Sequence, residues 1–313
     1  MVIHSACMVI LQRLQPKKDK IMSLKQPVQY PVKYYSHLDA GAPQLADADG
    51  VIKTILKACL VTGYGNGADA KVGAGWEMLF DDANRLIVRP PDAALHGFPD
   101  IKIENGIIDG TASHRIVTQD NPTGLDDAAE LAAVNLLARD RNAGVMWHCI
   151  VTDLSFLLCY EMGEGGTGSA PKRAIMYCGA LQNAIDRNSV TFVATDQDKI
   201  FRNGMGGSYL FRMLDDSFAF KDMINNTRSK VKTFLTSEVD EVGTLDAAFI
   251  HSPVFINDLI LPFYFALTKH TADYGTRVVI IDDRPMLRFV DCAYYWATAK
   301  ARTAYIPLDY WEF

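Results

Sequence analysis

A helical pattern of apolar residues runs from Leu45 to Val61. The apolar side chains recur there at steps of three and four residues, which is the spacing that places them on one face of an α-helix. Asp47 and Asp49 lie near the N-terminal end, where acidic side chains interact favourably with the helix dipole. Three glycines between residues 63 and 67 follow. The pattern predicts an amphipathic helix that ends at Gly63.

A β-hairpin pattern follows the helix. Trp76, Met78 and Phe80 alternate with other residues, and Asp81-Asp82-Ala83-Asn84 has the composition of a turn. The apolar stretch Leu86–Val88 then returns as a second strand, which two prolines end. The segment predicts two antiparallel strands joined at the acidic turn.

Two segments in the middle of the chain carry specific expectations. The pair Asn105-Gly106 lies between two apolar stretches and predicts a two-residue hairpin turn. From Asp126 to Arg139, the spacing of Leu131 and Val134 predicts a second helix.

The remaining pattern is dominated by strands. Val278–Ile281 and Met286–Val290 predict a hairpin with a four-residue connection, Asp282–Pro285. Further strand candidates are residues 113–118, 145–160, 173–177, 190–194, 230–235, 254–256 and 261–267. The fold class we expect is α+β, strand-dominated with a few helices and mostly antiparallel hairpins.

The order of these patterns predicts three parts. Residues 1–30 form an extended N-terminal segment, residues 31–162 a helix-plus-hairpin α/β unit, and residues 172–313 a β-rich C-terminal unit, with a glycine-rich loop between the last two. In residues 1–21 a short apolar run precedes its positive charges, the reverse of a secretory signal. Whether these residues belong to the mature protein stays open, because Met22 is an alternative start.

Composition narrows the function classes. The chain has 313 residues and a formal net charge of −6, which argues against a nucleic-acid binder because such proteins carry a basic face. No apolar stretch reaches the length of a membrane-spanning helix, so we expect no membrane insertion. The six cysteines form no CxxC pair, and reduced thiols in the core are the expectation.

Candidate chemistry is sparse. His148 precedes Cys149, but neighbours on a strand point to opposite faces, which argues against a catalytic dyad. Adjacent aspartates could bind calcium, but none lies in a loop of the D-x-D-x-D-G type. These pairs are Asp81-Asp82, Asp126-Asp127, Asp215-Asp216 and Asp282-Asp283. We therefore assign no catalytic residue, no cofactor and no metal ligand.

One part of the chain resembles a known family. The stretch YYSHLDAGAPQL, the helix end ACLVTGYG and the Gly75-Trp76 strand start are similar to the opening of a family of tailed-bacteriophage virion structural proteins. The matching residues are Ser36, Asp39, Ala40, Gly41, Ala42, Pro43, Gln44, Leu45, Ala58, Cys59, Leu60, Val61, Gly63, Gly75 and Trp76, with Trp147, Asp153 and Phe156 in a later strand. Lys57 departs from the family's aspartate. The match covers about a third of the chain.

The resemblance implies a component of the phage tail or baseplate. Such a protein is assembled in the bacterial host cytoplasm, resides in the virion, and acts through contacts with other virion proteins and as a homo-oligomer. The resemblance supplies no catalytic residue. Two other functions remain open: a host-binding adhesin with an aromatic platform for saccharides, and a cell-wall glycan hydrolase with two carboxylates.

Aromatic residues near the two ends are the candidate assembly contacts. Aromatics are enriched in protein interfaces, but they equally complete a core, and the sequence leaves both roles open. The candidates are Tyr34, Tyr35, Pro43, Trp76, Tyr305, Tyr310, Trp311 and Phe313. If the tail is a contact segment, deleting Tyr305–Phe313 leaves a folded chain that no longer joins particles.

Overall fold

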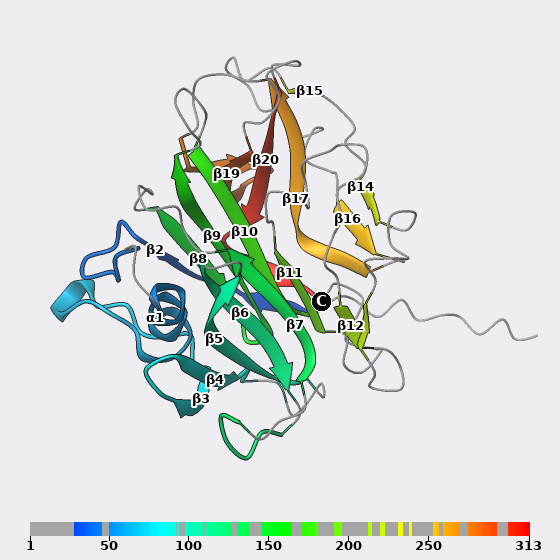
Figure 1. Cartoon of the computed structure of the whole chain (residues 1–313). Helices are drawn as coiled ribbons and strands as arrows, with labels where there is room; N and C mark the ends of the chain where they lie inside the picture. Colours follow the sequence, from blue (N-terminus) through cyan, green and yellow to red (C-terminus); the bar gives the residue numbers. More distant parts are fainter. Residues whose placement is uncertain are drawn as a thin grey trace, which may run out of the picture.

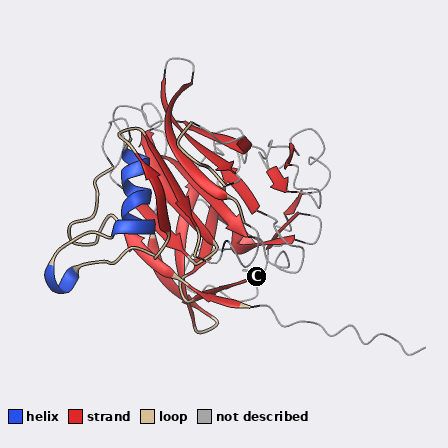
Figure 2. Cartoon of the chain, turned by 90° about the horizontal axis from the view of Figure 1, so that it is seen from below, coloured by secondary structure: helices blue, strands red, loops and turns tan. Residues whose placement is uncertain are grey.

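The computed structural model describes residues 28–45, 50–91, 93, 98–108, 111–119, 121–126, 130–137, 146–164, 171–180, 191–195, 212–214, 220–222, 231–233, 238–239, 253–256, 259–269, 275–292 and 300–313. Strands dominate these residues, and the helical segments lie to one side of them (Figures 1 and 2). The strand-dominated α+β class with mostly antiparallel hairpins is confirmed. The expectations for residues 1–21, Asp47, Asp49 and the pair Asp215-Asp216 lie outside the described residues.

A seven-stranded antiparallel sheet forms the middle layer, which we call the central sheet. Its strands, in spatial order, are β13 (Phe220–Asp222), β12 (Arg212–Leu214), β11 (Thr191–Thr195), β10 (Pro171–Ala180), β9 (Ser155–Glu164), β8 (Trp147–Val151) and β2 (Lys33–Ser36). The stretch expected as strand at 145–160 is two strands, β8 and β9, joined by a tight turn in which Thr152 donates its backbone N–H to the carbonyl of Ser155 at 2.8 Å.

Two further sheets flank it. The meander sheet consists of β3 (Glu77–Asp81), β4 (Arg85–Arg89), β5 (Asp100–Ile108), β6 (Thr111–Gln119) and β7 (Glu130–Leu137), paired in sequence order. The C-terminal sheet has the order β14 (Val231–Thr233), β16 (Pro253–Ile256), β17 (Leu259–Lys269), β20 (Lys300–Pro307), β19 (Arg284–Cys292) and β18 (Arg277–Ile281), and β15 (Glu238–Val239) pairs with β17. A small ribbon pairs β1 (Gln29–Pro31) with β21 (Tyr310–Glu312).

The central sheet is covered on both faces, and this explains its apolar sequence. Side chains of β9 alternate between two cores: Phe156 and Leu158 face the helix and the meander sheet, whereas Leu157 faces the C-terminal sheet. On β10, Cys178 and Tyr177 alternate in the same way. A strand buried on both faces has a continuous apolar sequence in place of an alternating one.

The predicted helix is shorter than its apolar pattern. The α-helix α1 (Val51–Lys57) continues as a π-helical turn, η1 (Ala58–Thr62), whereas Leu45 lies outside the helix and packs into the same core. The expected end at Gly63 is confirmed, with a φ of 72°. A Cβ atom at this position would lie 2.1 Å from the carbonyl oxygen of Lys71, so only glycine allows the loop to return so closely.

Two predictions about the meander sheet are wrong. Within the segment predicted as a second helix, residues 130–137 form β7, and seven of these eight residues pair with β6. The backbone hydrogen bonds of that ladder outweigh local helix propensity. Asn105 and Gly106 lie inside β5 and pair with β6. The two strands stay paired up to Ile108 and Thr111.

The two other hairpin predictions are confirmed, one with a shorter turn. β3 and β4 pair across the expected acidic turn. β18 and β19 pair directly up to Ile281 and Arg284, so their turn has two residues instead of four. Asp282 and Asp283 both have positive φ, 48° and 61°, as a two-residue hairpin turn of type I′ requires. The proposed division between residues 162 and 172 stays a prediction, and β9 pairs with β10 across it.

Candidate functional site

Residues of the stretch 34–76, whose sequence resembles phage virion proteins, contact the carboxylate of Asp39. Its Oδ2 accepts hydrogen bonds from the backbone N–H of Ser36 at 2.8 Å and from the hydroxyl of Tyr64 at 2.5 Å. Its Oδ1 lies 3.5 Å from the Nζ of Lys71. Burial and the hydrogen bond to Asp39 raise the pKa of Tyr64, so Tyr64 stays a neutral donor. One carboxylate thus joins the end of β2 to the loop after the helix, and we call this group the Asp39 node.

Close backbone contacts surround the node. A Cβ atom on Gly41 would lie 2.7 Å from the Cα of Gly65, and one on Gly65 would lie 2.7 Å from the carbonyl oxygen of Ala40. The indole Nε1 of Trp147 on β8 donates to the carbonyl oxygen of Pro43 at 2.7 Å. The stretch after β2 is therefore held against both the loop and the central sheet.

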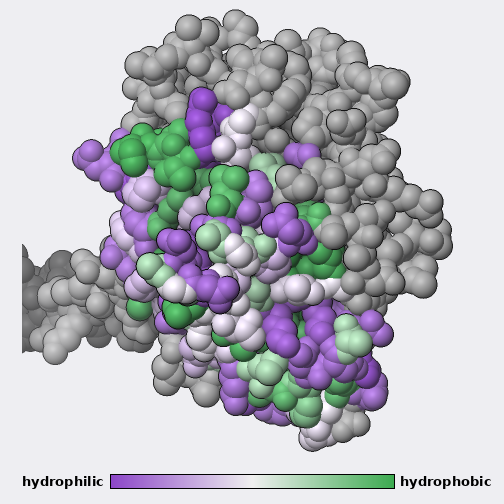
Figure 3. Space-filling view, turned by 90° about the vertical axis from the view of Figure 1, so that its left-hand side faces the viewer, coloured by the Kyte–Doolittle hydropathy of each residue, from purple (hydrophilic) through white to green (hydrophobic). Residues whose placement is uncertain are grey.

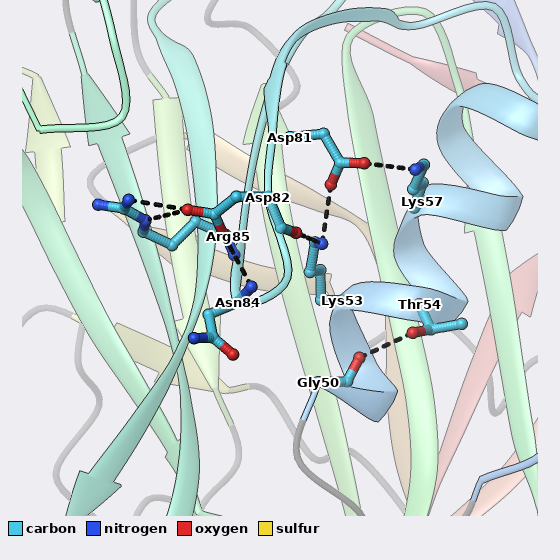
Figure 4. A network of polar contacts seen from close by, with 8 residues as sticks. All are labelled: Gly50, Lys53, Thr54, Lys57, Asp81, Asp82, Asn84 and Arg85. Carbon is cyan, nitrogen blue, oxygen red and sulfur yellow. Dashed lines mark hydrogen bonds and ion pairs between the residues drawn. The ribbon is translucent and has the colours of Figure 1, made fainter.

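A network of ion pairs fastens the helix to the β3–β4 hairpin (Figure 4). Asp81 lies 2.8 Å from the Nζ of Lys53 and 2.5 Å from that of Lys57, both on α1. Burial alone would raise the pKa of Asp81, but the hydrogen bonds and charges of the two lysines outweigh it and lower the pKa. Lys53 also donates to the carbonyl oxygen of Asp82.

The second aspartate of that turn has a different partner. The Oδ1 of Asp82 accepts the backbone N–H groups of Asn84 and Arg85 at 2.8 and 2.6 Å, and its Oδ2 lies 2.8 Å from the Arg85 guanidinium. Arg85 also contacts Asp126. The acid pair Asp81-Asp82 is thus occupied by cationic side chains and backbone donors.

The predicted contact residues near the N-terminus take part in the chain's own packing. Tyr35 is buried and donates to the carbonyl oxygen of Val72 at 2.8 Å. Trp76 is buried and donates to the carbonyl oxygen of Thr152 at 3.0 Å. Pro43 is half-buried under Trp147.

Tyr34, the fourth of these residues, is half-buried beside a histidine. Its hydroxyl lies 2.8 Å from the Nδ1 of His148, and the two rings stack with centroids 5.9 Å apart. Burial raises the pKa of Tyr34 to about 12. Cys149, the next residue, belongs to the core shared with the helix.

The C-terminal candidates also lie within the fold. Tyr305, Trp311 and Phe313 are buried, and Trp311 donates its indole N–H to the carbonyl oxygen of Pro307 at 3.1 Å. The Tyr310 ring is half-buried under the guanidinium of Arg284, 4.1 Å from its carbon. The aromatic tail is docked: Trp311 and Phe313 complete the core between the central and C-terminal sheets, and Tyr305 packs with Ile281 and Met286 in a separate cluster.

Apolar residues that the sequence analysis did not single out are exposed instead. Leu38 and Val72, on the loops around the Asp39 node, are 79% and 78% exposed. Ile280 and Val278, on β18, are 66% and 50% exposed. On the face shown in Figure 3, apolar residues form separate patches among polar ones. For β18 the sequence gives no signal of this exposure, because its buried and exposed residues are equally apolar.

Four cysteine side chains lie in the cores of the described residues. The thiols of Cys59, Cys149, Cys159 and Cys178 are buried, and burial raises the pKa of the Cys59 and Cys178 thiols. Within the described ranges, no group of three or more His, Cys, Asp or Glu side chains could hold a metal ion. Among the same residues, no helix combines the length and apolar character needed to cross a membrane.

Comparison with known proteins identifies no relative. No protein-family model, curated protein or solved structure matches the chain.

Proposed function

We propose that this chain is a structural protein of a bacteriophage virion, a tail or baseplate component that works by protein–protein assembly with copies of itself and with other virion proteins. The proposal comes from the resemblance of residues 34–76 to phage virion proteins. The observation that carries it is the Asp39 node. Residues of the resembling stretch hold the strand, the loop and the central sheet together through hydrogen bonds.

A structural role also fits the way the fold is stabilised. The central sheet is covered on both faces, and ion pairs tie the helix to the neighbouring hairpin. A particle component acts through surfaces that symmetry repeats, and such surfaces need a rigid body that carries them. Buried aromatic side chains and loops held by hydrogen bonds give this chain such a rigid body.

A glycan hydrolase fits the described residues less well. Such an enzyme needs two carboxyl groups facing a sugar, one of them with a raised pKa so that it can donate a proton. Lysines hold the pKa of Asp81 down against its burial, Lys102 and Arg115 do so for Glu104, and Arg284 does so for Asp309. These three carboxylates are paired anions and thus unsuited to act as general acids.

An adhesin would need exposed aromatic rings for saccharide stacking. The aromatic candidates of the sequence analysis are buried or half-buried in the chain. A glycan array with the purified protein tests this alternative, and specific binding to one saccharide class would favour it over a purely structural role.

Mass spectrometry of purified particles is the direct test. We expect peptides of this chain in gradient-purified virions at a fixed copy number relative to the other particle proteins, and immunogold label on the tail or baseplate. A host protein of similar abundance in the lysate serves as the control for carry-over. Finding the chain in infected cells but not in washed particles would refute the proposal.

A further inference from the structure

The strand β18 forms an edge of the C-terminal sheet and exposes apolar side chains. In the described part of the chain it pairs with β19 alone. Ile280 and Val278 project from one face of it and are 66% and 50% exposed. Val279 and Ile281 project from the other face and pack against Met286 and Tyr305. The strand is therefore anchored on one face and apolar on the other.

The backbone groups of the same two residues point away from the sheet. Ile281 and Arg284 flank the two-residue turn, and flanking residues in such a hairpin exchange both backbone hydrogen bonds. Because the pattern alternates, Ile280 and Val278 direct their N–H and C=O groups to the outer edge. Among the described residues no backbone hydrogen bond reaches these groups. The edge thus offers hydrogen-bonding groups and apolar side chains at the same positions.

Protected edges elsewhere in the molecule show the contrast. Natural proteins block sheet edges with charges, proline or bulges because an open edge recruits another strand. The edge strand β3 begins with Glu77, ends with Asp81 and has an irregular register between Met78 and Phe80. The edge strand β2 begins with Lys33. β18 also begins with a charged residue, Arg277, but its other four residues, Val278–Ile281, carry no charge, proline or bulge, and its register is regular.

We propose that the outer edge of β18 is a self-association surface, on which a second copy of this chain adds its own β18 in antiparallel orientation. The charges select this occupant. Arg277 lies at one end of the strand, and the exposed carboxylates of Asp282 and Asp283 lie at the other. Antiparallel pairing places each positive end beside the negative end of the other copy, whereas parallel pairing would bring like charges together.

Under twofold symmetry this contact joins two copies and leaves the same surface free on neither, so it forms a dimer that adds no further copy. A pairing centred on Ile280 aligns the outward-facing backbone groups of the two strands and continues the C-terminal sheet across both copies. It places Ile280 directly opposite Ile280 of the other copy and diagonally beside its Val278, on the same face, and each contact occurs twice, as an isologous interface requires. A five-residue strand buries less than a standard interface, so we expect a dissociation constant on the order of 10 µM. Fixation on a particle would reinforce it through multivalency.

The inference deepens the self-assembly in the proposed function and names its surface, yet it can be tested apart from it. Sedimentation velocity of the full chain from about 1 to about 100 µM should show a monomer–dimer equilibrium. Ile280→Lys should weaken the dimer at least about tenfold, because two lysines then meet at the twofold axis. Leu38→Lys, at a comparably exposed residue on a loop, is the matched control and should leave the equilibrium unchanged.

Two further variants test the backbone and the register. Ile280→Pro removes the outward N–H but keeps the pairing with β19, so it should abolish dimers in a folded chain. Ile280→Cys, in a chain that also carries Cys7→Ser and Cys292→Ser, should form a disulfide-linked dimer on mild oxidation. Its symmetry mate would lie about 5.5 Å away between Cα atoms, within disulfide reach. The described native cysteines are buried and should stay unreacted.

The outcomes separate this inference from the virion proposal. A chain that stays monomeric at every concentration and gives no cross-link at Ile280 overturns the inference, even when the protein is present in virions. A dimer that survives both Ile280→Lys and Ile280→Pro lies elsewhere and also overturns it. If Ile280→Lys fails to fold, the cross-link at Ile280→Cys decides. Absence from virions refutes the proposed function and leaves the dimer untouched.

Discussion

At the residue scale, the Asp39 node shows how one carboxylate fixes several backbone segments. Asp39 accepts two hydrogen bonds and faces one lysine, and its own backbone carbonyl accepts the N–H of Ala42 at 3.1 Å. A carboxylate suits this position because it accepts several bonds at once and strengthens each by its charge. Tyr64 reaches it from 25 residues further along the chain, so the node joins distant segments.

Removing Asp39 should therefore destabilise the whole chain. Asp39→Ala removes the acceptor of the Tyr64 hydroxyl and leaves the Ser36 N–H only its 3.3 Å bond to that hydroxyl, and we expect the free energy of unfolding to fall by about 2 kcal/mol. Tyr64→Phe removes the bond to Asp39 and this longer one and should cost about 1 kcal/mol. Because the two residues share a bond, the double variant should lose less than the sum. Urea unfolding followed by circular dichroism measures all three.

Asp69→Ala provides the control on the same loop. Asp69 is exposed and belongs to the short 3-10 turn Gly67–Asp69, so its removal should change stability by less than about 0.5 kcal/mol. Equal losses for Asp69→Ala and Asp39→Ala, or strict additivity of the Asp39 and Tyr64 variants, would contradict the role assigned to the node.

The sequence predicts the members of this site unevenly. Asp39, Gly41 and Trp76 stand out through the phage-like pattern. Tyr64 and Lys71 do not, because nothing local ties a residue on a glycine-rich loop to an aspartate that precedes the helix. The aromatic candidates at the chain ends show another reason why the sequence alone does not identify contact residues. Their composition suits an interface or a core equally, and burial of Trp311 and Tyr305 depends on a sheet that only the complete fold assembles.

At the element scale, local sequence signals predict a hairpin correctly when the turn residues and the strand pairing favour the same structure. Asp82 in the β3–β4 turn holds two backbone N–H groups, which is the local chemistry that favours aspartate there. Local signals fail where long-range pairing decides. Leu131 and Val134 have helical spacing, yet β7 takes its backbone partners from β6. Asn105-Gly106 would suit a hairpin turn, yet β5 continues through it because β6 matches it over nine residues.

The contact between α1 and the β3–β4 hairpin should be sensitive to acid. Lys53 and Lys57 lower the pKa of Asp81 in the folded chain despite its burial. A depressed folded pKa contributes stability that is fully present above the unfolded value, about pH 4, and that is lost as pH falls through the folded value. We expect Asp81→Asn to lose about 1 kcal/mol at neutral pH and to show a smaller stability loss between about pH 4 and pH 2 than the native chain.

A second substitution identifies the cause of that loss. Lys53 is largely buried, so Asp81→Asn leaves a cation without its counter-charge, and Lys53→Met in addition should restore part of the stability. Asp283→Asn, at the exposed β18–β19 turn, is the control and should keep the native pH dependence. Thermal unfolding over the acid range measures these differences, and identical profiles for Asp81→Asn and the native chain would contradict the ion-pair account.

At the scale of the whole molecule, the two ends of the described chain are joined by backbone hydrogen bonds. β1 pairs with β21, and the backbones of Val28 and Phe313 exchange two hydrogen bonds of 3.0 Å. Trp311 lies against Tyr177 of the central sheet, with ring centroids 5.9 Å apart. The final residues thus close the core between two sheets. Deleting Tyr305–Phe313 should consequently unfold the chain, and loss of particle incorporation by that deletion could not identify a contact segment.

Point variants in the last strand separate core packing from assembly. Trp311→Ala creates a cavity beneath the central sheet, and we expect the free energy of unfolding to fall by about 3–5 kcal/mol. Glu312→Ala, in the same strand, removes only an exposed hydrogen bond with Gln29 and should change it by less than about 0.5 kcal/mol. If the chain is a particle component as proposed, Trp311→Ala should reduce incorporation into particles only in proportion to the unfolded fraction at the growth temperature, because the tail belongs to the core, and incorporation should recover on cooling. Normal stability of Trp311→Ala combined with lost incorporation would show instead that the tail contacts another particle component directly.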